Sequence, residues 1–236
     1  MSSGPERVIS VEAGLRDGVI VTDMDRAEIT DRVMERGQLV LLKHAFPEPM
    51  LTAAQSAVAD WGRQVPPAEV DDFNGNYHRR RAMVARQQQA PHVFHDYNFN
   101  VLGDAPPALE ATLRDLFEPL RDLYNDLTGN AVGFTIPATG PYVHPQLIHY
   151  PAGGGFFARH WHNLSPQKLG FIVSLSQRGR DFRNGGTCFE IDGEVICIWR
   201  YDHPHWVTQS DLRDKFDWDS DAGRWVATFA YFDPRG

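Results

Sequence analysis

The segment HYPAGGGFFARHWHN, residues 149–163, carries the strongest pattern in the chain. A strand-like run ends at Tyr150, a glycine-rich turn follows, and a second short strand then presents His160 and His162. Residues i and i+2 of a strand point to the same face. The two imidazoles can therefore converge on one metal ion, or they can decorate an exposed strand face, and this segment alone leaves both interpretations open.

The pattern around this segment indicates a β-rich second half. Short strand-like runs separated by Gly, Pro, Asn and Asp follow one another from about residue 142, namely VHPQLIHY, FFARHWH, KLGFIVSLS, GTCFEI, EVICIWR, HWVT and RWVATFAYF. Such runs predict a sandwich or a jelly-roll barrel. His205 lies 45 residues beyond His160 (205 − 160), a separation that can return the chain to the same cavity in a barrel of short antiparallel strands.

The first half of the chain is predicted to be mixed. Apolar spacing favours helices over 25–36, 48–61 and 106–128, a strand over 38–46, and a long polar loop over 63–90. A loop of that length is uncommon unless it covers a site, and the alternating polar and aromatic segment 92–100 could roof the site with it. We expect one domain, with helical support and flanking strands in 1–141 and the barrel core with the metal site in 142–236.

Composition excludes several classes of protein. The chain has 236 residues and a formal net charge of −8, which argues against a nucleic-acid partner because phosphate binding needs a basic face. The sequence contains no run of about 18 apolar residues, so no membrane span is expected. The segment MSSGPERVIS lacks the apolar core of a signal peptide, and we therefore expect a cytoplasmic protein. Cys188 and Cys197 are expected to be small buried residues rather than a disulfide.

The order of these features resembles the iron(II)/2-oxoglutarate-dependent oxygenases, and in particular their small amino-acid hydroxylases and halogenases. The shared layout is a YPxGGxF approach, a His-x-carboxylate position, a Gly-Gly strand, a distal His-x-Val and an arginine on the last strand, over about residues 143–235. The resemblance implies a mainly β fold with supporting helices, a double-stranded β-helix of the jelly-roll, cupin-like type. It also implies Fe(II), 2-oxoglutarate as cosubstrate, O2 and a small-molecule substrate.

The resemblance carries over to single residues. His160 matches the first metal histidine, His205 the distal one, with His203 as a weaker alternative, and Arg224 the arginine that binds the far carboxylate of the cosubstrate. A planar guanidinium suits this role because it binds carboxylates through two parallel hydrogen bonds. Arg224 can also be an ordinary surface residue at the start of its strand.

Two positions depart from the family pattern. His162 stands where the family has Asp or Glu, and Val226 stands where many members have Ser or Thr, so that Thr228 is the nearest hydroxyl on that strand face. Neutral imidazole also suits iron, so His162 is a candidate third ligand, with water as the alternative. Halogenases of the family have Gly or Ala there, which makes room for chloride, and the size of His162 therefore ranks hydroxylation above halogenation.

The remaining site candidates surround these positions. Gln146 and Tyr150 share a strand face and are expected to assist the cosubstrate, or simply to line the barrel, and His149, Asn163 and Trp206 are candidate substrate contacts. The expected substrate is a small polar molecule such as an amino acid or a natural-product intermediate.

Two other functions remain open from the sequence. One is a three-histidine cupin-type iron oxygenase that works without 2-oxoglutarate, in which Arg224 would anchor a substrate carboxylate. The other is a non-catalytic barrel that binds a metal or a small ligand. The sequence does not indicate an oligomeric state, a homodimer being one option.

Overall fold

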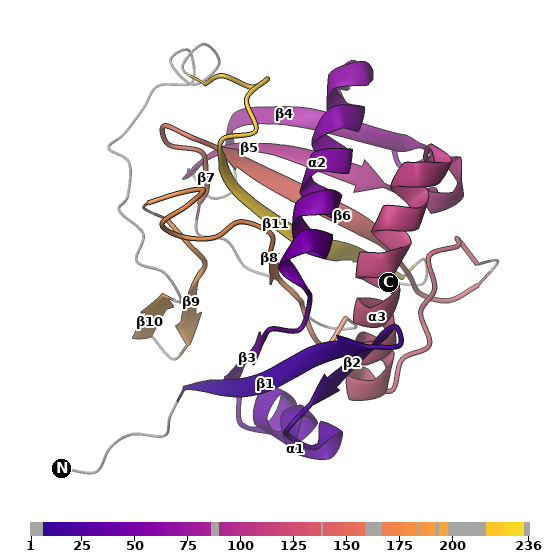
Figure 1. Cartoon of the computed structure of the whole chain (residues 1–236), viewed down its shortest axis with the longest axis vertical. Helices are drawn as coiled ribbons and strands as arrows, with labels where there is room; N and C mark the ends of the chain where they lie inside the picture. Colours follow the sequence, from indigo (N-terminus) through magenta and orange to yellow (C-terminus); the bar gives the residue numbers. More distant parts are fainter. Residues whose placement is uncertain are drawn as a thin grey trace.

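A six-stranded antiparallel sheet forms the centre of the molecule (Figure 1). The computed structural model describes residues 7–85, 90–137, 139–158, 167–183, 185–191, 194–197 and 216–233. Within them, the strands of this sheet are β4 (Asn76–Ala85), β5 (Ala90–Phe99), β6 (Tyr142–Pro151), β7 (Phe156–Phe157), β8 (Val173–Ser174) and β11 (Gly223–Phe232). Their order is β4-β5-β6-β11-β8, and β7 pairs with β5.

Two smaller sheets accompany it. One has the order β2-β1-β3, formed by β1 (Val8–Arg16), β2 (Val19–Thr22) and β3 (Leu39–Lys43). β1 and β2 join through Asp17 and Gly18, both with positive φ, 49° and 77°, as a two-residue type I′ hairpin turn requires. The second is the hairpin of β9 (Cys188–Ile191) and β10 (Glu194–Cys197). The strand at β3 was predicted from the sequence, whereas β1 and β2 were not.

Three α-helices lie where apolar periodicity predicted them. They are α1 (Arg26–Thr30), which continues as a π-helical turn over Asp31–Glu35, α2 (Glu48–Gln64) and α3 (Pro107–Thr128); a 3-10 turn, Leu102–Asp104, precedes α3. The predicted stripe of α3 is buried at Leu109, Leu113, Leu116, Leu120, Leu123 and Tyr124. None of the helices in the described ranges combines the length and the hydropathy of a membrane-spanning segment.

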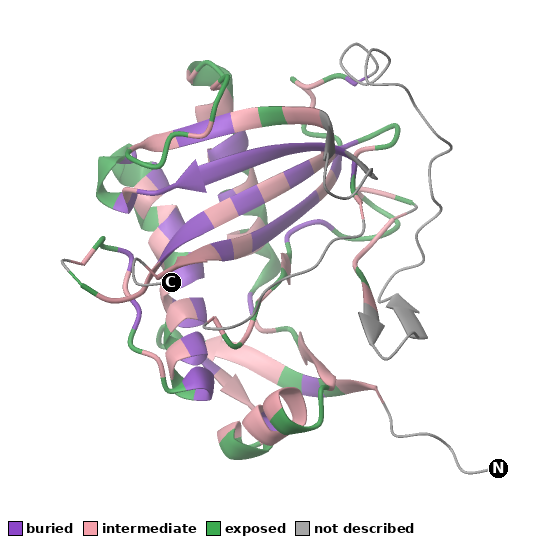
Figure 2. Cartoon of the chain, turned by 180° about the vertical axis from the view of Figure 1, so that it is seen from behind, coloured by how far each residue is buried: buried purple, intermediate pink, exposed green. Residues whose placement is uncertain are grey.

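Helices α2 and α3 cover one face of the large sheet (Figure 1). The Trp61 ring of α2 lies 5.0 Å from the ring of Phe99 on β5, and the Tyr124 ring of α3 lies 5.2 Å from that of Phe229 on β11. Both contacts belong to one hydrophobic core that runs between the helices and the sheet. The opposite face, seen in Figure 2 with the helices behind it, is free of described helices.

The predicted loop and roof are corrected by the structure. Residues 76–85, expected in a loop, form β4, and the expected roof 92–100 lies almost entirely in β5, next to the centre of the sheet. The two strands pair in register from Asn76 opposite Phe99 to Ala85 opposite Ala90. The prediction was wrong because both strands carry polar side chains where an ordinary buried strand carries apolar ones.

The closed barrel is not observed among the described strands, because β4 and β8 remain the outer strands of the large sheet. A mainly β fold with supporting helices is confirmed to that extent. The expectation of two buried thiols is wrong for Cys188, which is exposed and disulfide-bonded. Strand pairing places it opposite Cys197, and opposed residues of a hairpin lie close enough for such a bond.

Candidate functional site

The face of the large sheet turned away from α2 and α3, here called the far face, carries the candidate site (Figure 2). Directly opposed residues of paired strands point to the same side of a sheet. The strand registers therefore place on it Arg79 and Arg81 of β4, Phe94, Asp96 and Asn98 of β5, Gln146, Ile148 and Tyr150 of β6, and Arg224, Val226 and Thr228 of β11.

The four predicted cosubstrate residues all lie on the far face, as two separate pairs. Tyr150 is opposite Arg224, and Gln146 is opposite Thr228. The two pairs are four residues apart along the strands, and this corresponds to about 13 Å at the rise per residue of a β-strand. The pairs therefore serve different parts of a ligand or different ligands.

Arg224 is positioned at the very start of β11 by its glycine neighbour. A Cβ on Gly223, whose φ is 133°, would lie 2.2 Å from the carbonyl oxygen of Tyr150. The absent side chain lets β11 begin against the end of β6, so that the Arg224 guanidinium carbon lies 5.4 Å from the Tyr150 ring centroid. Arg224 Nη2 also donates to Thr187 Oγ1 at 2.5 Å. The hydroxyl that contacts Arg224 is thus that of Thr187, whereas Thr228 lies on the same strand face four residues along β11.

Arg224 is a half-buried cation. Its Nε is buried and makes no hydrogen bond, and no carboxylate of the described residues pairs with it. Desolvation lowers the pKa of Arg224, with a smaller opposing effect of Tyr150, and burial raises the pKa of Tyr150. A buried cation is costly unless it is paired, so this environment fits a ligand carboxylate.

A second polar group crosses β4, β5 and β6. Arg81 Nε and Nη2 donate to Asp96 Oδ2 at 3.0 and 2.8 Å. Asn98 Nδ2 donates to the same oxygen at 3.1 Å, and Gln146 Nε2 donates to Asn98 Oδ1 at 3.0 Å. This row of four side chains is here called the Asp96 row. Burial acts against the charge of Arg81, but its hydrogen bonds to Asp96 raise its pKa overall.

Unsatisfied polar atoms concentrate on this side of the sheet. Among the described residues, the buried side-chain atoms without a hydrogen-bond partner are Asp96 Oδ1, Asn100 Oδ1, His144 Nδ1 and Arg224 Nε. The registers and the alternation of the strands assign three of them to the far face, and Asn100 continues the β5 alternation one residue past its end. Buried polar atoms are normally paired, so their gathering on one face indicates that this face receives a ligand.

Aromatic contacts connect the Tyr150–Arg224 pair to the start of the segment with the predicted metal ligands. The Tyr150 ring lies 6.2 Å from that of Phe94, which lies 4.9 Å from that of Phe157. Phe157 in turn packs on His92 at 4.3 Å, and the Ala158 amide donates to His92 Nδ1 at 3.2 Å. Ala158 is therefore fixed near the end of the sheet where Arg224 lies.

The predicted metal ligands themselves are not described. His160, His162 and His205, with the candidate substrate residues Asn163 and Trp206, lie outside the described residues. Within the described ranges, no group of three His, Cys, Asp or Glu side chains is arranged to hold a metal ion. The described chain stops at Ala158, whose amide is bound to His92 at this end of the sheet.

His149 does not belong to the far face. Strand alternation turns it toward the helices, where its ring stacks on Trp225 with centroids 4.4 Å apart, and its Nε2 lies 3.0 Å from the Ala222 carbonyl oxygen. Burial lowers its pKa. His149, a candidate substrate contact, therefore points to the opposite side of the sheet from Tyr150, because adjacent strand residues point to opposite faces.

A buried hydrogen-bond chain under the helices was not anticipated. His78 Nε2 lies 2.6 Å from the Val65 carbonyl oxygen, His78 Nδ1 lies 2.6 Å from His95 Nε2, and His95 Nδ1 lies 3.0 Å from the Tyr97 hydroxyl. Because a carbonyl only accepts, His78 donates to Val65, His95 donates to His78, and Tyr97 donates to His95. This arrangement requires both histidines to be neutral.

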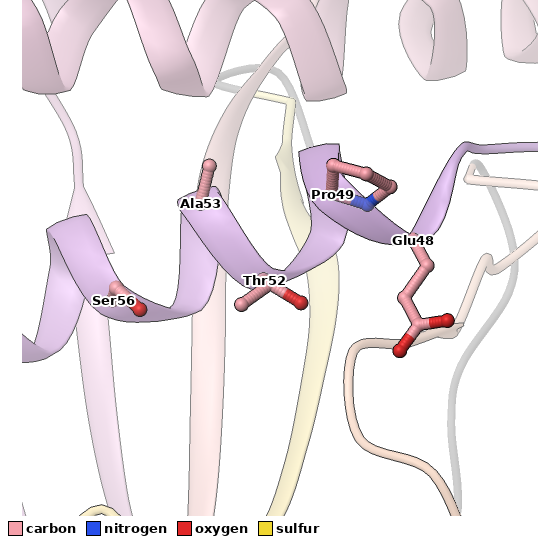
Figure 3. Close-up of a pocket in the computed structure, with 5 residues that line it drawn as sticks. All are labelled: Glu48, Pro49, Thr52, Ala53 and Ser56. Carbon is pink, nitrogen blue, oxygen red and sulfur yellow. The ribbon is translucent and has the colours of Figure 1, made fainter.

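The surface pocket in Figure 3 is unrelated to the far face. Its lining comes entirely from the outer side of α2, at Glu48, Pro49, Thr52, Ala53 and Ser56, and all five residues are exposed. It presents no convergent buried polar groups of the kind that orient a bound ligand.

Comparison with protein-family models, with curated proteins and with solved structures finds no match to this chain. The features that bear on function are therefore the far face and the sequence motif of residues 149–163. The Asp96 row was missed in the sequence because Asp96 and Asn98 belong to the segment 92–100, which was interpreted as part of a roof over the site.

Proposed function

We propose that this protein is an iron(II)/2-oxoglutarate-dependent oxygenase that oxidises a small polar molecule, with the far face of the large sheet as the floor of its active site. The observation that carries the proposal is the state of Arg224. Arg224 is a half-buried arginine at the second position of the last strand. Its buried Nε makes no hydrogen bond, and no carboxylate of the described residues pairs with it. A carboxylate-bearing ligand would complete it.

The neighbours of Arg224 suit the carboxylate end of 2-oxoglutarate. Thr187 accepts from one guanidinium nitrogen and so restrains its plane, and the Tyr150 ring packs beside the cation. The rings of Phe94 and Phe157 extend the aromatic surface that begins at Tyr150. Aromatic neighbours reduce the hydration of the guanidinium, and reduced hydration strengthens its pairing with a bound carboxylate.

His160 and His205, with His162 or water in the third position, would hold Fe(II). Their imidazoles fit a non-haem iron site, which leaves open positions for a chelating cosubstrate and O2. The metal with its cosubstrate supplies the oxidising chemistry, and the protein supplies position and a dry cavity. The approach of Ala158 to His92 supports this arrangement, since it holds the backbone two residues before His160 at the Arg224 end of the sheet.

A spectroscopic titration tests the proposal. Under anaerobic conditions, the full-length protein with Fe(II) and 2-oxoglutarate is expected to develop the weak visible absorption of a metal-chelated keto acid, and admission of air is expected to yield succinate. Arg224→Leu should raise the 2-oxoglutarate concentration needed for half the absorption by roughly tenfold or more, since a charge-assisted pair is lost. Arg16→Leu, at an exposed position of β1, serves as the control and should leave the titration in place.

Two outcomes would count against the proposal. Absence of both the absorption and succinate would favour an iron oxygenase without 2-oxoglutarate or a non-catalytic ligand-binding barrel. An unchanged titration in Arg224→Leu would remove Arg224 from the cosubstrate site even if succinate is formed.

A further inference from the structure

Asp96 combines deep burial with an open acceptor. Its side chain is only 2% exposed, and its Oδ1 makes no hydrogen bond. All three donors that reach this carboxylate, two from Arg81 and one from Asn98, go to Oδ2. A buried carboxylate oxygen without a donor costs free energy of folding, so its presence in the middle of the far face indicates a partner that the described residues do not supply.

The Asp96 row orients a second acceptor beside it. The Gln146 side-chain amide donates a hydrogen bond from Nε2 to Asn98 Oδ1. The Oε1 atom of Gln146 has no donor among the described residues. Asn98 is opposite Gln146 in the β5–β6 register, so Asp96 and Gln146 are diagonal neighbours, and diagonal pairs of an antiparallel sheet lie roughly 7–8 Å apart at Cα. Two oxygens from such a pair can approach one small cationic group.

The arginines of β4 do not compete as anion sites here. Arg81 is paired with Asp96 and also with Asp71 at 2.6 Å, and Arg79 is paired with Asp71 at 3.2 Å. Two cations and two carboxylates thus balance within the group. Arg79 and Arg81 are therefore weak receptors for a ligand carboxylate.

Arg224 and the open acceptor of Asp96 are far enough apart to define two ligand positions. Asp96 is opposite Ile148, and Arg224 is opposite Tyr150 on the other side of β6. Asp96 and Arg224 are two strand spacings apart across the sheet and two residues apart along it. Their Cα atoms are therefore separated by roughly 12 Å. A carboxylate at Arg224 and a cation at Asp96 can therefore be bound at the same time.

We propose that Asp96 Oδ1, assisted by Gln146 Oε1, binds the ammonium group of a small amine, which makes amines the substrate class of this site. An ammonium ion has three donors and a positive charge, and it is the group that an unpaired carboxylate oxygen flanked by an amide oxygen recognises. As a statement about substrate the inference rests on the proposed function, whereas ammonium binding at Asp96 can be measured without iron or 2-oxoglutarate.

The experiment is a chemical-shift titration of the metal-free, full-length protein with butylammonium chloride. The neutral analogue 1-butanol and sodium chloride at equal ionic strength are titrated in parallel. Butylammonium should saturate and shift the amide resonances of Asp96, Asn98, Gln146 and Ile148, and 1-butanol should bind about tenfold more weakly or worse, since a hydrogen bond to a charged group is lost. Equal binding of the amine and the alcohol would overturn the proposal.

The matched variants separate Asp96 from the general acidity of the chain. Asp96→Asn keeps the shape of the side chain and should weaken butylammonium binding by about tenfold or more, whereas Asp71→Asn removes the other carboxylate bound to Arg81 and should leave it unchanged. Binding that survives Asp96→Asn would contradict the proposal.

A second variant covers the case in which Asp96→Asn does not fold. Ile148→Lys places a tethered ammonium directly opposite Asp96 in the ladder and should exclude butylammonium while the protein stays folded by circular dichroism. Undiminished binding in this variant would equally overturn the proposal. None of these butylammonium titrations depends on Arg224. Absence of amine binding at Asp96 can therefore be distinguished from absence of 2-oxoglutarate binding at Arg224.

Discussion

Arg81 donates through both Nε and Nη2 to a single oxygen of Asp96, at 3.0 and 2.8 Å. The two residues belong to neighbouring strands and lie diagonally across the β4–β5 ladder. Because the bond is made at one oxygen only, the pair neutralises the carboxylate electrostatically while its second oxygen stays available. This geometry differs from a purely structural ion pair, in which both oxygens are usually engaged.

Removal of Arg81 should be strongly destabilising. Arg81→Ala leaves the 2%-exposed Asp96 side chain without its cation, and we expect the free energy of unfolding to fall by about 3–5 kcal/mol. Urea denaturation measures it. The control is Arg32→Ala, which breaks an i,i+4 pair with the half-exposed Glu28 and should cost about 1 kcal/mol or less. Similar losses for the two variants would mean that Asp96 is better solvated than the structure indicates.

Gly223 should not tolerate a side chain. In Gly223→Ala the new Cβ would meet the Tyr150 carbonyl oxygen at 2.2 Å, at a φ of 133°. We expect a loss of roughly 1–3 kcal/mol or more in the free energy of unfolding and a displaced Arg224. Gly14→Ala is the matched control, because a Cβ there meets no atom within 4 Å. Thermal unfolding of both variants provides the comparison, and equal behaviour would argue against the close approach of β11 to β6.

Stability should decrease as the pH falls below about 6.5. Burial, followed by the repulsion of neighbouring His78, lowers the pKa of His95 to about 2, and burial also lowers the pKa of His78. Between the unfolded and folded pKa values the unfolded chain binds more protons, so each such histidine removes up to about 1.4 kcal/mol per pH unit. The stabilisation is fully present above the unfolded pKa and is lost as the pH falls.

Urea midpoints measured from pH 7.5 to 5 test this dependence. His95→Phe should reduce the slope, since one buried titrating group is gone, although it also breaks the bonds to His78 and Tyr97. His44→Gln, at a side chain that is 81% exposed, is the control and should leave the slope in place. A stability that does not change over this range would refute the neutral hydrogen-bond chain.

The hydroxyl that serves Arg224 should be that of Thr187. If 2-oxoglutarate binds at Arg224, Thr187→Val should weaken it by about tenfold, because the donor at 2.5 Å loses its acceptor and the guanidinium its restraint. Thr228→Val, four residues along β11, should have little effect. Anaerobic titration with 2-oxoglutarate distinguishes the two, and the reverse order would restore Thr228 to the role that its sequence position suggested.

Local patterns predicted the elements whose faces are cleanly divided. The leucine stripe of α3 and the apolar spacing of α2 were recognised because each helix has one buried and one solvated side. The strand at 142–151 and the last strand were recognised for the same reason. β4 and β5 were missed because their far-face residues, such as Arg81, Asp96 and Asn98, are polar and nevertheless buried or half-buried.

By itself, the sequence determined the helices, the β-rich second half and the residue types of a candidate iron site. Only the tertiary structure decided that Arg224 lies beside Thr187 and Tyr150 rather than Thr228, that His149 faces the helices, and that Asp96 keeps one oxygen open. Helix periodicity is written in neighbouring residues, whereas strand register and the partner of a buried charge depend on segments far apart in the chain, so no local pattern could specify them.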